Sequence, residues 1–284
     1  VNISMKKTIV LLSAWIFSVG VFAQQAREEM KKDRNLSADN YVAYPGPQKP
    51  QTPAPKGYKP FYISHYGRHG SRYLIGTKDY DFPYFTLAHA DSLGKLTPKG
   101  KETLRKLDLI RREANGRDGE LTLRGAQQHK DIARRMYRNY PEVFAGKANI
   151  EARSTLVIRC ILSMENALQQ LLALNPQLQI FHDASRHDLY YMNQEDKKLQ
   201  AQKMPEEVKE VYNQFSKKHD VYERVMNSLF NDATYWKENV NGSELNRNLY
   251  RLASNLQSTE LRSKVSLYDL FTDDELYDAW LRYN

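Results

Sequence analysis

Short apolar runs along the chain predict the strands of a sheet. The first, at 61–66, is aromatic and β-branched, follows a proline and ends at Gly67, which predicts a strand leading directly into a tight turn. Three shorter runs, at 149–153, 178–181 and 188–192, are further strand candidates.

Between these runs, apolar positions recur at helical spacing behind recognisable start signals. Thr97 is a predicted N-cap followed by a proline in the first turn, and its helix is expected to run to Gly116. Thr122 opens a second helix, which Pro141 ends. Ser154 is expected to cap a third helix with one apolar face.

The later part of the chain has a different character. Residues 194–264 are polar, charged and helical in pattern, which predicts a helical insertion packed on an α/β core. Residues 272–275 form a capping box with acids in the first turn. By contrast, prolines interrupt 45–60, and an extended arm is expected there.

These elements predict an α/β fold with a mostly parallel central sheet flanked by helices and with an inserted all-helical cap. Few strands precede the long helical stretch, so the core is expected to be incomplete and the chain to be C-terminally truncated. The expected divisions are a signal peptide at 1–23, a proline-rich arm at 24–60, the core at 61–192, and the helical cap with the start of a return to the core at 193–284.

The N-terminus has the pattern of a secretory signal peptide. Lys6 and Lys7 precede an uncharged, almost wholly apolar run at 8–21, and small residues at Val21 and Ala23 mark a cleavage site before Gln24. We therefore expect export to the periplasm, the cell exterior or the envelope, with no stable membrane span after cleavage. The alternative interpretation is an uncleaved membrane anchor.

Composition narrows the classes of partner. The formal net charge of +8 is spread along the chain, without the clustered Lys and Arg of a nucleic-acid-binding arm. A small polyanion is therefore favoured over nucleic acid. The seven histidines show no metal-ligand spacing and there is no Gly-rich nucleotide loop, so the sequence predicts no metal and no cofactor.

The stretch Arg68-His69-Gly70-Ser71-Arg72 carries the candidate chemistry. It follows the predicted strand, and ligands of α/β folds bind at such strand ends. Guanidinium groups clamp phosphate oxygens in pairs, and the glycine allows a close backbone approach. The histidine between the two arginines would face the phosphorus, and their charge would keep its imidazole neutral and nucleophilic. A solvated surface turn is the competing interpretation.

Residues 62–73, containing this motif, resemble the histidine acid phosphatase branch of the histidine phosphatase superfamily, and most of all the multiple inositol polyphosphate phosphatases. The helix openings at 96–97 and 121–122 and the stretch 153–163 match in the same order. The likeness covers about 61–192.

The resemblance implies roles for four residues. His69 would be the nucleophile that becomes phosphorylated, and water would then hydrolyse the phosphohistidine. Arg68 and Arg72 would hold the scissile phosphate, and Arg159 would complete the phosphate site from a helix start. Leu74 departs from the family, which often has proline at that position.

The proton donor is missing from this pattern. The family supplies it from a His-Asp or His-Ala-Glu segment after a later core strand. The chain has His-Asp pairs at 182–183, 187–188 and 219–220 and His-Ala-Asp at 89–91, and none of them fits well. The donor is therefore unknown and expected beyond Asn284.

Three functions follow from the sequence. The first is a phosphomonoesterase acting on inositol polyphosphates. The second is a phosphatase of broader range, and the third is a catalytically silent phosphate-binding protein that lacks the proton donor. All three imply a small phosphorylated ligand, and none fixes the oligomeric state.

Overall fold

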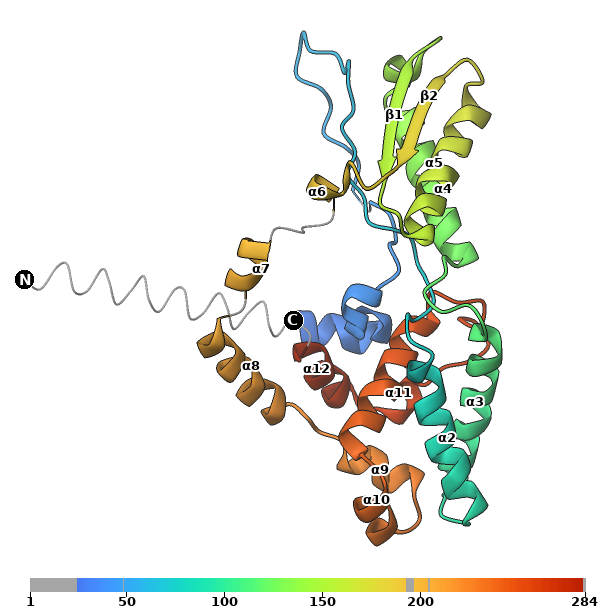
Figure 1. Ribbon diagram of the computed structural model, residues 1–284, viewed down its shortest axis with the longest axis vertical. Coiled ribbons are helices and arrows are strands. Elements are labelled where there is room, and N and C mark those ends of the chain that lie inside the picture. Colours follow the sequence, from blue (N-terminus) through green and yellow to red (C-terminus); the bar gives the residue numbers. More distant parts are fainter. Residues whose placement is uncertain (1–24, 48, 193–196, 204, 283–284) are drawn as a thin grey trace, which may run out of the picture.

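The computed structural model describes residues 25–47, 49–192, 197–203 and 205–282. The predicted signal peptide at 1–23 lies outside these residues. In Figure 1 the strands β1 and β2 lie with α4 and α5 in the upper part, and α2, α3 and α9–α12 lie in the lower part. Within the described ranges, none of the helices combines the length and the apolar character that crossing a bilayer requires.

The sheet contains β1 (Asn149–Ser154) and β2 (Gln179–Ala184), which pair in parallel with Asn149 opposite Gln179 and Ser154 opposite Ala184. The helix α5 (Ile158–Leu174) connects the two strands, and α4 (Leu123–Asn139) packs along it. The α/β class and two of the predicted strands are thus confirmed.

Two other strand predictions are wrong. Residues 61–66 belong to no strand, and Phe61 is 91% exposed. A strand needs a neighbour that receives and returns its backbone hydrogen bonds, and no described segment lies beside 61–66 in that way. The run at 188–192 forms the short helix α6 (Leu189–Met192) instead, because so short an apolar run does not by itself distinguish strand from helix.

The predicted helix starts are confirmed where a side chain caps them. Thr97 accepts a hydrogen bond from the Gly100 amide at the start of α3 (Pro98–Ala114). Thr122 does the same for the amide of Gly125 at the start of α4. The capping box at Thr272 opens α12 (Asp273–Leu281). By contrast, α5 begins at Ile158 rather than near Ser154, because β1 continues through Ser154.

Helices from both halves of the chain form the larger hydrophobic core. It contains Leu87 of α2, Leu107 of α3, Leu229 of α9 and Leu249 of α11, each almost fully buried. The core therefore joins segments from both sides of residue 193, where the sequence predicted a division between core and cap. The remaining bounds are α2 (Lys78–Ser92), α7 (Lys197–Gln202), α8 (Glu206–Lys218), α9 (Glu223–Leu229), α10 (Ala233–Asn239), α11 (Gly242–Leu256), η2 (Pro141–Phe144) and η3 (Tyr268–Leu270).

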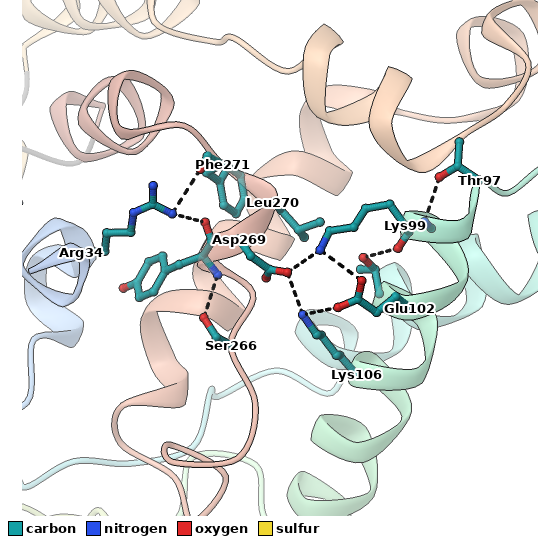
Figure 2. A network of polar contacts seen from close by, with 12 residues as sticks. Arg34, Thr97, Lys99, Glu102, Lys106, Ser266, Asp269, Leu270 and Phe271 are labelled. Atoms are coloured by element: carbon teal, nitrogen blue, oxygen red, sulfur yellow. Dashed lines mark hydrogen bonds and ion pairs between the residues drawn. The ribbon is translucent and has the colours of Figure 1, made fainter. Parts of the chain in front are cut away.

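A charged network fixes the segment around η3 to α3 (Figure 2). Asp269 accepts hydrogen bonds from Lys99 and Lys106, and both lysines also pair with Glu102. Burial alone would raise the pKa of the Asp269 carboxyl, but the hydrogen bonds from the two lysines outweigh burial and lower it. On the other side of the segment, Arg34 donates to the carbonyl of Tyr268 at 2.9 Å.

The N-terminal arm is fastened to the C-terminal helices. It contains a helix at 25–32 and the 3-10 segment η1 (Arg34–Tyr41), which packs on α11 and α12. The Tyr250 hydroxyl donates to the carbonyl of Ser37, and the Ala43 amide donates to Gln257 at 2.8 Å. These contacts hold the arm beside the motif at 68–72.

Candidate phosphate-binding site

The motif loop lies against the N-terminal end of α4 at very short range. The Ser71 carbonyl accepts hydrogen bonds from the amide and hydroxyl of Thr122, at 2.9 and 3.0 Å. A Cβ atom at Gly70 would lie 2.4 Å from the carbonyl oxygen of Gly125, and one at Gly125 would lie 2.2 Å from that of Ser71. Neither position has room for a side chain, so the two glycines permit this contact.

Side chains from two helices fix the loop further. The Gly70 amide donates to the Ser163 hydroxyl of α5 at 3.0 Å, and the Ser71 amide donates to Gln128 of α4 at 2.9 Å. Ser163 is buried and donates in turn to the carbonyl of Arg159. The loop therefore has a single well-defined path between α4 and α5.

His69 is held as a neutral base. Its Nδ1 lies 2.9 Å from the carbonyl oxygen of Gly70. A carbonyl only accepts, so Nδ1 carries the proton and Nε2 keeps its lone pair. Burial lowers the pKa of His69 to about 4, with smaller contributions from the charges of Arg159, Arg68 and Arg72.

Arg68 and Arg72, which flank His69 in the sequence, line the same cavity as His69. Arg68 donates to the carbonyl of Asn40 at 3.3 Å, and the guanidinium of Arg72 lies 5.8 Å from the centroid of the Tyr41 ring. The Nε of Arg72 is buried and has no acceptor among the described residues. A buried donor without an acceptor is costly, and an anion would satisfy it.

Arg159 lies beside these three residues rather than among them. Its Nη1 is 3.5 Å from the carbonyl oxygen of Gly119, and its Nε is buried without an acceptor in the described part of the chain. Arg159 does not line the cavity that contains the motif. It is close enough to contribute to the lowered pKa of His69.

The motif opens into a cavity of about 730 Å³ between the arm and α4. Its lining includes three arginines, three histidines and no aspartate or glutamate. Such a cavity is electrostatically suited to a multiply charged anion. The six basic residues are Arg68, Arg72, Arg135, His65, His69 and His129.

A second cavity, of about 840 Å³, lies on the β1 side of the same segment and shares Arg68 and His69 with the first. Aliphatic residues such as Ile63, Ile150 and Leu168 line much of it. Glu151 is the one carboxylate in its lining.

The helix α4 contributes residues to the cavity that the sequence motif at 68–72 did not predict. Gln128 and Arg135 lie on one face of this helix, with Ile132 between them, and all three line the first cavity. Their spacing of four and then three residues was the available signal. His129 is also buried there, and burial, followed by the neighbouring His65, lowers the pKa of its imidazole.

None of the weighed acid segments lines either cavity. His182 of β2 contacts Glu165 at 2.6 Å and is substantially exposed. His219 contacts Asp278 at 2.8 Å, and Asp220 pairs with Arg282. None of these segments is thus placed to act as the proton donor at His69. The described residues also contain no cluster of three or more metal-ligating side chains.

We expect the titration of His69 to depend on Arg159. Replacing Arg159 with glutamine removes one positive charge, so the pKa of His69 should rise above about 4. The shift should be partial, because burial is the larger cause. The neutral form is the reactive one, and activity should therefore be lost at a higher pH as the solution is acidified.

Nuclear magnetic resonance titration of the His69 ring measures this directly. Replacement of the exposed Arg105 of α3 with glutamine is the control and should leave the pKa of His69 unchanged. An unchanged pKa in the Arg159 variant would show that this guanidinium does not act on His69.

Solved structures of a bacterial phosphatase share this architecture. A scan of protein-family models gave no match, and neither did a search of curated proteins. The chain is similar to Bifidobacterium longum multiple inositol polyphosphate phosphatase in its complex with phosphate, with a TM-score of 0.61, 14% identity, and coverage of 80% of this chain and 63% of that chain. For the apo form the values are 0.61, 15%, 85% and 64%.

The complex of the same phosphatase with inositol hexasulfate gives a TM-score of 0.54 at 15% identity, covering 80% of this chain and 63% of that chain. The chain thus spans less than two thirds of the length of these structures. At this identity the comparison establishes the fold: the chain shares the architecture of the multiple inositol polyphosphate phosphatase structures.

Proposed function

We propose that this protein is a phosphomonoesterase that removes phosphate from inositol polyphosphates through a phosphohistidine at His69. The observation that carries the proposal is a neutral histidine beside Arg68 and Arg72, in a cavity whose lining has no carboxylate. The fold shared with inositol polyphosphate phosphatase structures supports it.

The geometry supports a two-step transfer. In the first step Nε2 of His69 attacks phosphorus, the bond from phosphorus to the substrate oxygen breaks, and that oxygen leaves with a proton from a general acid. In the second step water attacks phosphorus, its proton goes to the deprotonated general acid, and the bond from phosphorus to Nε2 breaks, which releases phosphate and regenerates neutral His69. Arg68 and Arg72 are the fixed cations that stabilise the charge on the transferring oxygens.

The source of the proton is part of the proposal. We propose that the general acid is a residue other than those of the His-Asp and His-Ala-Asp segments, because none of these segments lines either cavity. A protein with the clamp and without the acid would bind phosphate and turn over slowly or not at all, which is the third of the functions that the sequence allows. We also propose that the protein is exported and acts outside the cytoplasm.

Phosphate release from two substrates tests the proposal. Purified protein, with whatever chain follows Asn284 in the cell, is incubated with phytate and separately with para-nitrophenyl phosphate. Faster release from phytate is the expected result, and comparable rates would favour a phosphatase of broad range.

Calorimetry on the same samples distinguishes silent binding. Binding of phytate without any released phosphate would contradict the enzymatic proposal and favour a phosphate-binding protein. Phosphorus resonance of a trapped phosphohistidine would support the proposed intermediate.

A further inference from the structure

We propose that Arg135, held by Tyr44, binds a second phosphate group of the substrate while the first lies at His69. The inference rests on the proposed function and specifies its substrate: a molecule with at least two phosphates, of which the one at Arg135 is not transferred. Arg135 would then be a specificity-determining residue.

The surroundings of Arg135 favour an anion. The side chain is half-buried in the wall of the 730 Å³ cavity, and its guanidinium lies 5.6 Å from the centroid of the Tyr44 ring. It forms no ion pair with a carboxylate of the described residues. Its neighbour Arg134 is different, because it points outward and pairs with Asp131 at 2.6 Å.

The arm contacts each of the three cavity arginines. The Asn40 carbonyl accepts from Arg68, the Tyr41 ring lies under Arg72, and the Tyr44 ring lies under Arg135. A cation over an aromatic face is attracted by the ring and loses freedom of movement. The three guanidinium groups are therefore positioned before substrate arrives, which reduces the entropy lost on binding.

The backbone of the arm is strained where these contacts begin. Asp39 has a φ of 48°, which residues with a side chain rarely adopt. Strain of this kind persists where surrounding structure maintains it, and it concentrates at functional sites. The contacts of η1 with α11 and α12 maintain it here.

The spacing along α4 separates the two phosphate positions. Gln128 holds the loop of His69, and Arg135 lies seven residues later on the same helix. Seven residues correspond to roughly 10 Å, about two turns, along a helix axis. The backbone of Arg135 thus lies about two turns beyond that of Gln128, which places Arg135 for a phosphate other than the one at His69.

Calorimetry with two probes, phytate and inorganic phosphate, tests the subsite without requiring turnover. We expect Arg135→Gln to weaken phytate binding by about tenfold or more, because a charge-assisted contact is lost. Inorganic phosphate needs only the site at His69, and its affinity should stay within about twofold. Arg134→Gln, on the adjacent outward-facing position, is the matched control and should change neither affinity.

Two further variants separate binding from a structural role. Arg135→Lys keeps the charge and should recover part of the phytate affinity. Tyr44→Ala leaves the charge but removes the ring that holds it, so phytate binding should weaken less than in Arg135→Gln. Equal loss for both probes, or no loss for phytate, would overturn the subsite.

These outcomes are distinct from those of the proposed function. If the wild-type protein binds both probes without releasing phosphate, the enzymatic proposal is contradicted. The subsite is still supported in that case if Arg135→Gln weakens the binding of phytate but not of inorganic phosphate. If the wild-type protein releases phosphate normally and Arg135→Gln weakens both probes equally, the enzymatic proposal is supported and the proposed subsite is contradicted.

Discussion

Replacement of His69 by alanine should abolish phosphate release, with kcat/KM falling by on the order of a thousandfold or more. The reason is that Nε2 of this residue is the atom proposed to attack phosphorus, and neither His65 nor His129 replaces it. His129 is 7% exposed and packed against the backbone of Arg68. The measurement is steady-state release of phosphate from phytate.

Inorganic phosphate should still bind to the His69→Ala protein, because Arg68 and Arg72 remain. This combination of retained binding and lost turnover identifies a nucleophile rather than a structural residue. His89, an exposed histidine of α2, provides the control, and its alanine variant should match wild type. Phosphate release by His69→Ala at the wild-type rate would show that the nucleophile is wrongly assigned.

Gly125→Ala should be the most damaging small substitution near the site. The new Cβ would lie 2.2 Å from the carbonyl oxygen of Ser71 and 2.8 Å from its amide nitrogen. Both are backbone atoms, so the loop must move away from α4 as a unit. We expect the free energy of unfolding to fall by about 3 kcal/mol, as in severe overpacking.

The same movement should weaken phosphate binding, because Ser71 lies between His69 and Arg72. Gly76→Ala is the matched control. A Cβ there would meet Asp79 at 3.6 Å, an ordinary contact, and its stability should stay within about 0.5 kcal/mol of wild type. Denaturant unfolding and phosphate calorimetry measure the two effects. A Gly125→Ala protein with wild-type stability would contradict the close packing of loop and helix.

The parts of the structure that the sequence predicted are those set by local chemistry. Thr97, Thr122 and Thr272 each cap the helix that follows, because a threonine hydroxyl needs only the amide three residues on. In the same way, Arg68, His69 and Arg72 reach one cavity because they share a single loop.

The parts that the sequence did not predict depend on partners distant along the chain. Segment 61–66 has the composition of a strand, yet a strand also requires a neighbour, and composition does not contain that information. Likewise, Tyr41 and Tyr44 come to lie under arginines because α11 and α12 hold the arm in place. Nothing in the residues around Tyr44 indicates a partner as distant along the chain as Arg135.

A cavity with three arginines and no acid also attracts anions other than the substrate. Released phosphate is one of them, so the product competes with the substrate for the same cations. On the proposed function, the protein works fastest where free phosphate is scarce and slows as phosphate accumulates. Sulfate or citrate in a purification buffer should inhibit phosphate release in the same way. The protein should therefore be assayed in buffers of low ionic strength that contain few multivalent anions.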